Sequence, residues 1–160
     1  VMAILEHHFC GTVSNVLQNN ITPFLSGKVV TVVGRSEIAG MPIALMTLRA
    51  GATVNVCHAR TANLIEHTKQ ADILVTAAGA PGLITTAHVR PGAIVVDVGI
   101  SRLPIQMDTK TCIAGDVDIE CVKTVASAIT PVPGGVGRVT VSMVAHNLLK
   151  AALLRRNYKT

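Results

Sequence analysis

Aromatic residues are nearly absent from this sequence: its 160 residues include two phenylalanines, one tyrosine and no tryptophan. Proteins that bind single-stranded nucleic acid commonly stack the bases on aromatic side chains, so this absence argues against such a partner. Hydrophobic residues make up 49% of the chain, and because so few of them are aromatic, the core must consist of valine, isoleucine, leucine and alanine. A core of this kind is typical of a parallel β-sheet covered by helices on both faces.

Charged residues are also few, at 14% of the chain, and the formal net charge is +5. The positive charges are scattered except at Arg155, Arg156 and Lys159, which we interpret as a solvated helix end rather than a nucleic-acid patch. No apolar run is long enough to span a membrane, because Asn147 and Lys150 interrupt the last one. We therefore expect neither a nucleic-acid partner nor a membrane span.

Metal-binding patterns are missing as well. The four cysteines show no C-x-x-C spacing, and we expect reduced, buried thiols in a reducing compartment: Cys10, Cys57, Cys112 and Cys121. Asp116 and Asp118 lack the spacing of a calcium loop, so a turn and a helix N-cap are the better interpretation. We predict no metal site.

Residues 28–42 organise the rest of the chain. A β-branched run ends at Gly34 and predicts a buried strand, and Pro42 opens an apolar helical pattern through Leu48. A strand, a glycine turn and a helix form the first half of a βαβ unit, in which backbone N–H groups face a ligand at the helix start. The spacing is not G-x-G-x-x-G, so nucleotide binding and a ligand-free turn are both open at this point.

Further segments continue the alternation of strands and helices. Strands are expected at 53–57, 73–78, 94–98 and 128–130, helices at 62–70, from 118 to about 126 and at 139–156, and a loop or short hairpin at 101–117. In the last helix we expect the inner side to carry Val141, Val144, Leu148, Ala151 and Ala152. The predicted fold is α/β and Rossmann-like, a doubly wound, mainly parallel sheet with helices on both faces. Residues 1–25 form a helix end and an irregular stretch, and residues 26–160 form the domain.

Polar and glycine-rich segments follow the carboxyl ends of the predicted strands. After the second strand there is no acidic residue to bond a ribose 2′-hydroxyl; His58 and Arg60 stand there instead, next to Thr61. Positive groups at this position suit a 2′-phosphate, although an exposed basic turn is the alternative. With Gly79 and the run Pro133–Gly137, these segments outline one crevice at the sheet edge.

Several motifs occur in the order and spacing of a known family. They are Gly34-Arg35-Ser36 with Gly40-Met41-Pro42, Cys57-His58 with Thr61, Asp97 to Ile100, Gly115-Asp116-Val117, and Ile129 to Gly137. The chain closely resembles the NAD(P)-binding domain of bifunctional methylenetetrahydrofolate dehydrogenase/cyclohydrolases over about residues 26–154. The run Pro-Val-Pro-Gly-Gly-Val-Gly carries most of this resemblance, because Gly-Arg-Ser alone is a weak signal.

This resemblance implies hydride transfer from 5,10-methylenetetrahydrofolate to a nicotinamide cofactor, NADP or alternatively NAD, and then hydrolysis of the methenyl product. By similarity and by position at the strand ends, the cofactor-binding residues are Gly34, Arg35, Ser36, Gly40, His58, Arg60, Thr61, Gly79, Ile100 and Thr140. Those bordering the folate are Pro133, Gly134, Gly135, Val136 and Gly137. The family also implies a homodimer and a cytosolic or mitochondrial location.

The sequence departs from the family in ways that matter for activity. The N-terminal domain with the family's catalytic lysine is not in this chain, so no residue here is assigned a catalytic role and no turnover of the chain alone is expected. Ala59 replaces a serine common in NADP-dependent members, and Arg138-Val139 replaces Pro-Met. The alternative is therefore a non-catalytic structural or docking subunit of a larger assembly.

Overall fold

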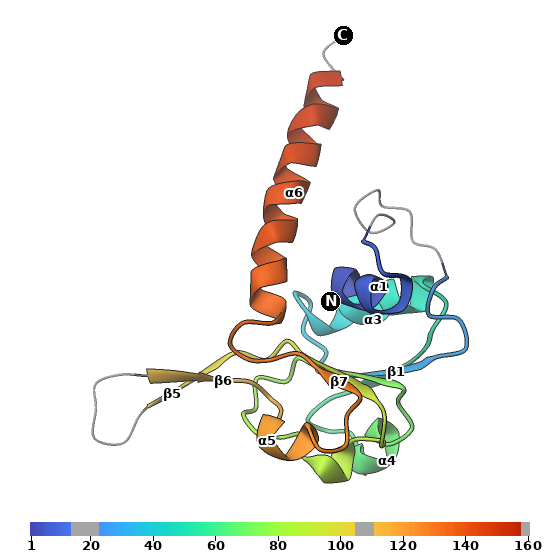
Figure 1. The fold of residues 1–160 in the computed structure, drawn as a ribbon, viewed down its shortest axis with the longest axis vertical. Coiled ribbons are helices and arrows are strands. Elements are labelled where there is room, and N and C mark those ends of the chain that lie inside the picture. The colour runs from blue at the N-terminus through green and yellow to red at the C-terminus, as the bar shows by residue number, and fades with distance from the viewer. Residues whose placement is uncertain (14–22, 105–110, 158–160) are drawn as a thin grey trace.

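A five-stranded parallel sheet forms the centre of the molecule (Figure 1). The computed structural model describes residues 1–13, 23–104 and 111–157. The strands are ordered β2-β1-β3-β4-β7, and their bounds are β1 Val29–Val33, β2 Thr53–Cys57, β3 Ile73–Thr76, β4 Ile94–Asp97 and β7 Ala128–Ile129. All four pairings are parallel, which confirms the predicted α/β fold.

The central strands are buried on both faces, as their β-branched sequences predict. Val30 and Val32 of β1 are fully buried, and they pair in register with Ile73 and Val75 of β3. The one polar side chain in β1, Thr31, is also buried, and its hydroxyl donates a hydrogen bond to the carbonyl of His67 at 3.1 Å. The strand therefore leaves no unsatisfied side-chain hydroxyl in the core.

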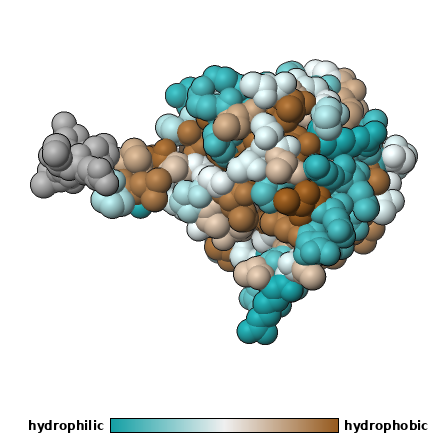
Figure 2. Space-filling view, turned by 90° about the horizontal axis from the view of Figure 1, so that it is seen from below, coloured by the Kyte–Doolittle hydropathy of each residue, from teal (hydrophilic) through white to brown (hydrophobic). Residues whose placement is uncertain are grey.

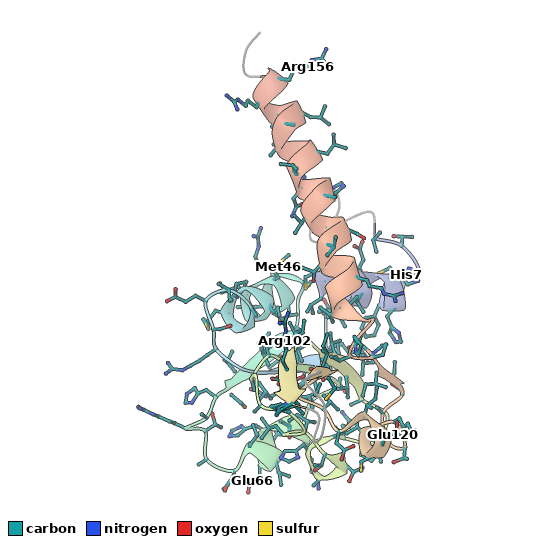
Figure 3. The ribbon with its side chains drawn as sticks, turned by 90° about the vertical axis from the view of Figure 1, so that its left-hand side faces the viewer. His7, Met46, Glu66, Arg102, Glu120 and Arg156 are labelled. Carbon is teal, nitrogen blue, oxygen red and sulfur yellow. The ribbon has the colours of Figure 1, made fainter. Side chains whose placement is uncertain are left out.

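Helices cover both faces of the sheet, which confirms the doubly wound arrangement. One apolar cluster joins the sheet to α1 (Met2–Cys10), α3 (Gly40–Arg49) and the start of α6 (Val136–Asn157). The opposite cluster joins it to α4 (Leu64–Thr68), α5 (Ile119–Val122) and the residues on either side of the 3₁₀ helix η1 (Thr86–His88), Ile84 and Val89. In Figure 3, Met46 of α3 and His7 of α1 lie on one side of the sheet, with Glu66 of α4 and Glu120 of α5 on the other.

An antiparallel hairpin extends sideways from the sheet as an arm (Figures 1 and 2). It consists of β5 (Ser101–Pro104) and β6 (Thr111–Ala114), with Ser101 opposite Ala114. Of the two alternatives for residues 101–117, the hairpin is therefore correct. Leu103 and Ile113 are exposed on this arm.

Helix α6 projects from the body, and the predicted inner side of this helix is wrong. Val141, Val144 and Leu148 are 72%, 61% and 71% exposed, and Ala151 and Ala152 are exposed as well. The side that packs carries the buried Val136 and the half-buried Val139 and Met143, because only the first turns of the helix reach α1 and the sheet. Apolar residues occur around most of this helix, so periodicity alone did not identify the face that packs.

Two other expectations need correction. Only Cys57 is buried; Cys10, Cys112 and Cys121 are exposed, since they lie at a helix end, on the arm and on the outer side of the short helix α5. Helix α3 begins at Gly40, two residues before the predicted start. The irregular stretch predicted before residue 26 falls largely on residues 14–22, which lie outside the described residues.

Among the residues that the structure describes, no helix has the length and apolar character needed to cross a membrane.

Candidate nucleotide-binding site

The predicted site residues follow strands whose carboxyl ends lie at one edge of the sheet. The chain leaves β1 for β2 on one side and later returns to β3 on the other, so β1 and β3 form the topological switch point. In open α/β sheets, ligands bind outside the strands at such a point. The residues that follow the five strands are Gly34, His58, Ala77, Val98 and Thr130.

Two glycines let the start of α3 approach the end of β1 closely. A Cβ added at Gly34 would lie 2.2 Å from the carbonyl oxygen of Ala77, and one at Gly40 would lie 2.1 Å from that of Gly34. Gly34 also has a φ of 125°, in the region that favours glycine. The switch point is thus built from three main-chain segments in contact, and no side chain fits between them.

Arg35 and Ser36 lie exposed between these glycines. The Ser36 hydroxyl accepts a hydrogen bond from the Gly40 N–H at 3.4 Å, and its carbonyl accepts one from Met41 at 3.0 Å. Ser36 therefore satisfies N–H groups of the first turn of α3, where unpaired donors and the helix dipole favour anions. The exposed Arg35 side chain adds a positive charge beside the same helix start.

The turn after β2 is organised by His58 and Thr61. The Thr61 hydroxyl accepts a hydrogen bond from the His58 N–H at 2.9 Å, and His58 Nδ1 accepts one from the Arg60 N–H at 3.1 Å. A neutral His58 ring therefore carries its proton on Nε2, which remains available as a donor. Arg60 is exposed. The turn offers two donors at the position where a Rossmann-like fold meets the adenosine ribose.

An apolar cleft of about 330 Å³ lies at the carboxyl ends of β4 and β7. It is lined by the whole run Pro133–Gly137 together with Ile100 and Thr140. Nothing lies within 4 Å of a Cβ added at Gly134 or Gly137, so these glycines leave open space beside the main chain. Ile100 and Thr140, predicted to bind the cofactor, and the run Pro133–Gly137, predicted to border the folate, therefore line one cleft.

A second cleft, of about 350 Å³, connects this region to α3. It is lined by Ile38, Ala39 and Pro42 at the start of α3, and it shares Val98, Val136 and Thr140 with the first cleft. The two clefts therefore adjoin along the carboxyl edge of the sheet. The other predicted residues lie at the same edge but line neither cleft: Gly34, Arg35, Ser36, Gly40, His58, Arg60, Thr61 and Gly79.

Two buried aspartates at this edge were not predicted as site residues. Asp116 accepts hydrogen bonds from the N–H groups of Ala78, Gly79 and Ala80, and Asp97 accepts them from Gly99, Asp116 and Val117. Burial raises the pKa of Asp97, while these bonds and one from the Thr76 hydroxyl lower it in part. The predicted N-cap is Asp118, whose carboxylate accepts the Cys121 N–H at 3.3 Å.

A doubly wound sheet with a side-chain-free switch point, basic donors after β2 and an adjoining apolar cleft defines a dinucleotide-binding domain. The family description "Tetrahydrofolate dehydrogenase/cyclohydrolase, NAD(P)-binding domain" matches residues 10–156. The chain belongs to this family, and it spans the family's NAD(P)-binding domain.

Curated relatives and solved structures agree with this assignment. The "Bifunctional protein FolD" of Bacillus subtilis is 50% identical over 142 residues, covering 89% of this chain and 48% of the relative. That of Nitrosospira multiformis is 56% identical over 128 residues, covering 80% and 43%. The chain therefore spans about half the length of the curated relatives it matches.

Among solved structures, the bifunctional FolD of Campylobacter jejuni aligns with a TM-score of 0.76 at 45% identity, covering 88% of this chain and 47% of the other. The Trypanosoma brucei methylenetetrahydrofolate dehydrogenase-cyclohydrolase aligns with a TM-score of 0.75 at 38% identity, covering 86% and 47%. The latter structure is described as complexed with NADP cofactor and inhibitor.

Proposed function

We propose that this chain binds NADP(H) as the cofactor domain of a methylenetetrahydrofolate dehydrogenase/cyclohydrolase and has no turnover alone. The observation that carries the proposal is the pair of adjoining clefts at the carboxyl edge, bordered by main chain at Pro133–Gly137 and by Ile100 and Thr140. NADP, which the Trypanosoma brucei relative is described as holding, is a dinucleotide of the kind such an edge accepts.

The residues present suit this cofactor. In the proposed binding mode the loop before α3 and the positive end of the helix dipole face the phosphates, Arg35 and Arg60 neutralise the 2′-phosphate, and His58 Nε2 donates a hydrogen bond to it. The bound cofactor supplies the hydride acceptor. The chain's own part is to orient it: Ile100 and Thr140 border the nicotinamide, and the open space beside Gly134 and Gly137 admits the folate. We propose that the intact protein is longer than this chain, and that its other half, the N-terminal domain with the family's catalytic lysine, supplies the acid–base step.

Calorimetric titration with NADP and with NAD tests this proposal. We expect NADP to bind more tightly than NAD. Replacing Arg60 by Ala should weaken NADP binding about tenfold and leave NAD binding nearly unchanged, because only NADP has the phosphate that Arg60 would contact. Arg49→Ala, the same change at the far end of α3, is the matched control and should alter neither affinity. Absence of binding heat with both nucleotides would contradict the proposal.

The exposed apolar surface supports a second proposal, on partners. We propose that the exposed side of α6 (Val141, Val144 and Leu148) packs against the other half of the longer protein, which also carries most of the folate site. We propose further that the intact protein is a homodimer in the cytosol or the mitochondrial matrix. The alternative, a non-catalytic docking subunit, would use the same α6 surface.

Light scattering, for the mass, and urea unfolding, for the stability, of the intact protein and of Leu148→Lys distinguish these proposals. If the other half covers α6, the variant should lose folding stability without a change of mass. Dissociation of the variant into monomers would instead place the subunit contact on this helix. A monomeric intact protein would contradict the proposed dimer.

A further inference from the structure

The Asp116 carboxylate is fully buried at the edge of the sheet where the clefts lie. Its partners in the described part of the chain are three successive main-chain N–H groups: Ala78 at 2.6 Å, Gly79 at 3.2 Å and Ala80 at 2.8 Å. Gly79 has a φ of 67°, which turns its N–H toward the same point as its neighbours'. Successive N–H groups that converge in this way form a concave anion-binding site, often called a nest.

In many proteins such a nest after a strand holds a phosphate. Here the anion comes from Asp116, 36 to 38 residues further along the chain. The Gly79 N–H is thus already donated. This leaves the loop of residues 35–39 between β1 and α3, which carries the positive side chain of Arg35, as the main-chain segment at the switch point for an anionic ligand.

Asp97 fixes Asp116 in turn. Asp97 Oδ1 accepts the N–H of Asp116 at 3.2 Å, that of Gly99 at 2.9 Å and the hydroxyl of Thr76 at 3.0 Å. Asp97 Oδ2 accepts the N–H of Val117 at 3.0 Å. The two carboxylates therefore connect the ends of β3 and β4 to residues 115–117, and the Val98 and Ile100 positions that border the clefts follow directly from Asp97.

Two glycines are required by this arrangement. A Cβ added at Gly99 would lie 2.3 Å from Asp116 Cγ, and one added at Gly115 would lie 2.0 Å from Asp97 Oδ2. Each carboxylate therefore occupies the space that a side chain on the opposing segment would need. The connection is tight enough that a shift of either carboxylate would move the main chain around Gly99, next to Ile100.

We propose that Asp116 is a positioning residue of the nucleotide site: its carboxylate takes the place of an anionic ligand in the nest of residues 78–80 and so fixes the segments that border the clefts. This inference rests on the proposed nucleotide binding. A direct consequence is that Asp116→Ala vacates a carboxylate-sized, donor-lined space. Formate, the smallest carboxylate, should then occupy the nest in place of the lost side chain.

The test is chemical rescue of Asp116→Ala with formate, with sodium chloride at the same ionic strength as the salt control. Two quantities are measured: the Tm followed by circular dichroism, and the Kd for NADPH followed by nicotinamide fluorescence. Removing the carboxylate that three successive N–H groups share should lower the Tm and weaken NADPH binding about tenfold. Formate, and not chloride, should raise the Tm and restore at least part of the affinity.

Asp118→Ala is the matched control, because it removes the same charge two residues away, at the start of α5 and outside the nest. It should lower the Tm slightly, leave the Kd for NADPH unchanged and respond equally to both salts. If Asp116→Ala binds NADPH like the wild type, or if formate raises the Tm without improving its affinity, the positioning role is overturned. If formate and chloride act alike on both quantities, the nest itself is overturned.

If Asp116→Ala does not fold, a second measurement on the wild-type chain tests the same inference. Hydrogen exchange of the wild-type chain without nucleotide should show the amides of residues 78–80 protected, because Asp116 already holds them, and added NADPH should not protect them much further. Rapid exchange that slows strongly with NADPH would overturn the inference. Failure of the wild type to bind NADPH would refute only the proposed function, since formate rescue of the Tm does not need the cofactor.

Discussion

Replacing Gly40 by Ala should destabilise the chain strongly, although Ala is normally the better helix former. The added Cβ would lie 2.1 Å from the Gly34 carbonyl oxygen, at least 1.3 Å inside an ordinary contact of 3.4 Å. The atom it meets belongs to the main chain, which cannot rotate away. Overpacking of this kind costs about 1–3 kcal/mol, and we expect about 3 kcal/mol here because both segments are fixed by the sheet.

Gly137→Ala is the matched comparison. Gly137 is also in the first turn of a helix, but nothing lies within 4 Å of a Cβ added there, and its φ is not positive. The same substitution should therefore stabilise α6 by up to about 1 kcal/mol, from helix propensity alone. The two variants thus change the free energy of unfolding in opposite directions, and they should differ by roughly 3–4 kcal/mol.

The assay is urea unfolding followed by far-ultraviolet circular dichroism, because the chain has no tryptophan to report unfolding by fluorescence. For a chain of this size, the loss in Gly40→Ala corresponds to a Tm lower by roughly 6–12 °C. An unchanged m-value would show that the native state, and not the extent of unfolding, has changed. Equal stability of the two variants would refute the close approach of α3 to the end of β1, and with it the side-chain-free switch point.

Three further predictions follow from burial and titration. Iodoacetamide should modify the exposed Cys10 and Cys112 first. Cys121 should follow, because its hydrogen bond to Asp118 raises its pKa, and Cys57 should react last, because burial raises its pKa. Peptide mass spectrometry gives the order of modification. Burial raises the pKa of Asp97 above 3.8, so the folded chain binds a proton at Asp97 more tightly than the unfolded chain does. The contribution of Asp97 to the free energy of unfolding should therefore fall as the pH rises from 3.8 through the raised pKa. Urea unfolding at several pH values should show this slope in the wild type and not in Asp97→Asn. In this chain by itself, Leu148→Ala should change the free energy of unfolding by less than about 0.5 kcal/mol, whereas Leu5→Ala, at a fully buried position, should cost about 2–5 kcal/mol, both measured by denaturant titration.

Local sequence patterns predicted the parts of the fold that depend on neighbouring residues. The β-branched run before Gly34 gave a strand at Val29–Val33, and Thr53–Cys57 is a strand with the predicted bounds. Asp118 caps its helix as predicted, since a cap contacts a residue only three positions away. Such features follow from φ/ψ preferences and short-range hydrogen bonds, which the sequence specifies directly.

Features that depend on distant residues could not be predicted in this way. Asp116 was interpreted as part of a turn because its partners lie 36 to 38 residues earlier in the chain, and no local pattern records a contact of that separation. The inner side of α6 was misassigned for a related reason. The helix is apolar on more than one side, and which side packs depends on where α1 lies.

The glycines at the carboxyl edge show why glycine-rich loops do not all mark ligand contacts. Gly134 and Gly137 face open space in the region of the cleft, where a missing side chain leaves room for a ligand. At Gly40, Gly99 and Gly115 the space is instead filled by the protein's own carbonyl or carboxylate oxygens. The first kind makes room and the second holds the loops together. Substitution should therefore impair ligand binding at Gly137 and folding at Gly40, Gly99 and Gly115, whereas at Gly134, whose φ is 111°, it should impair both.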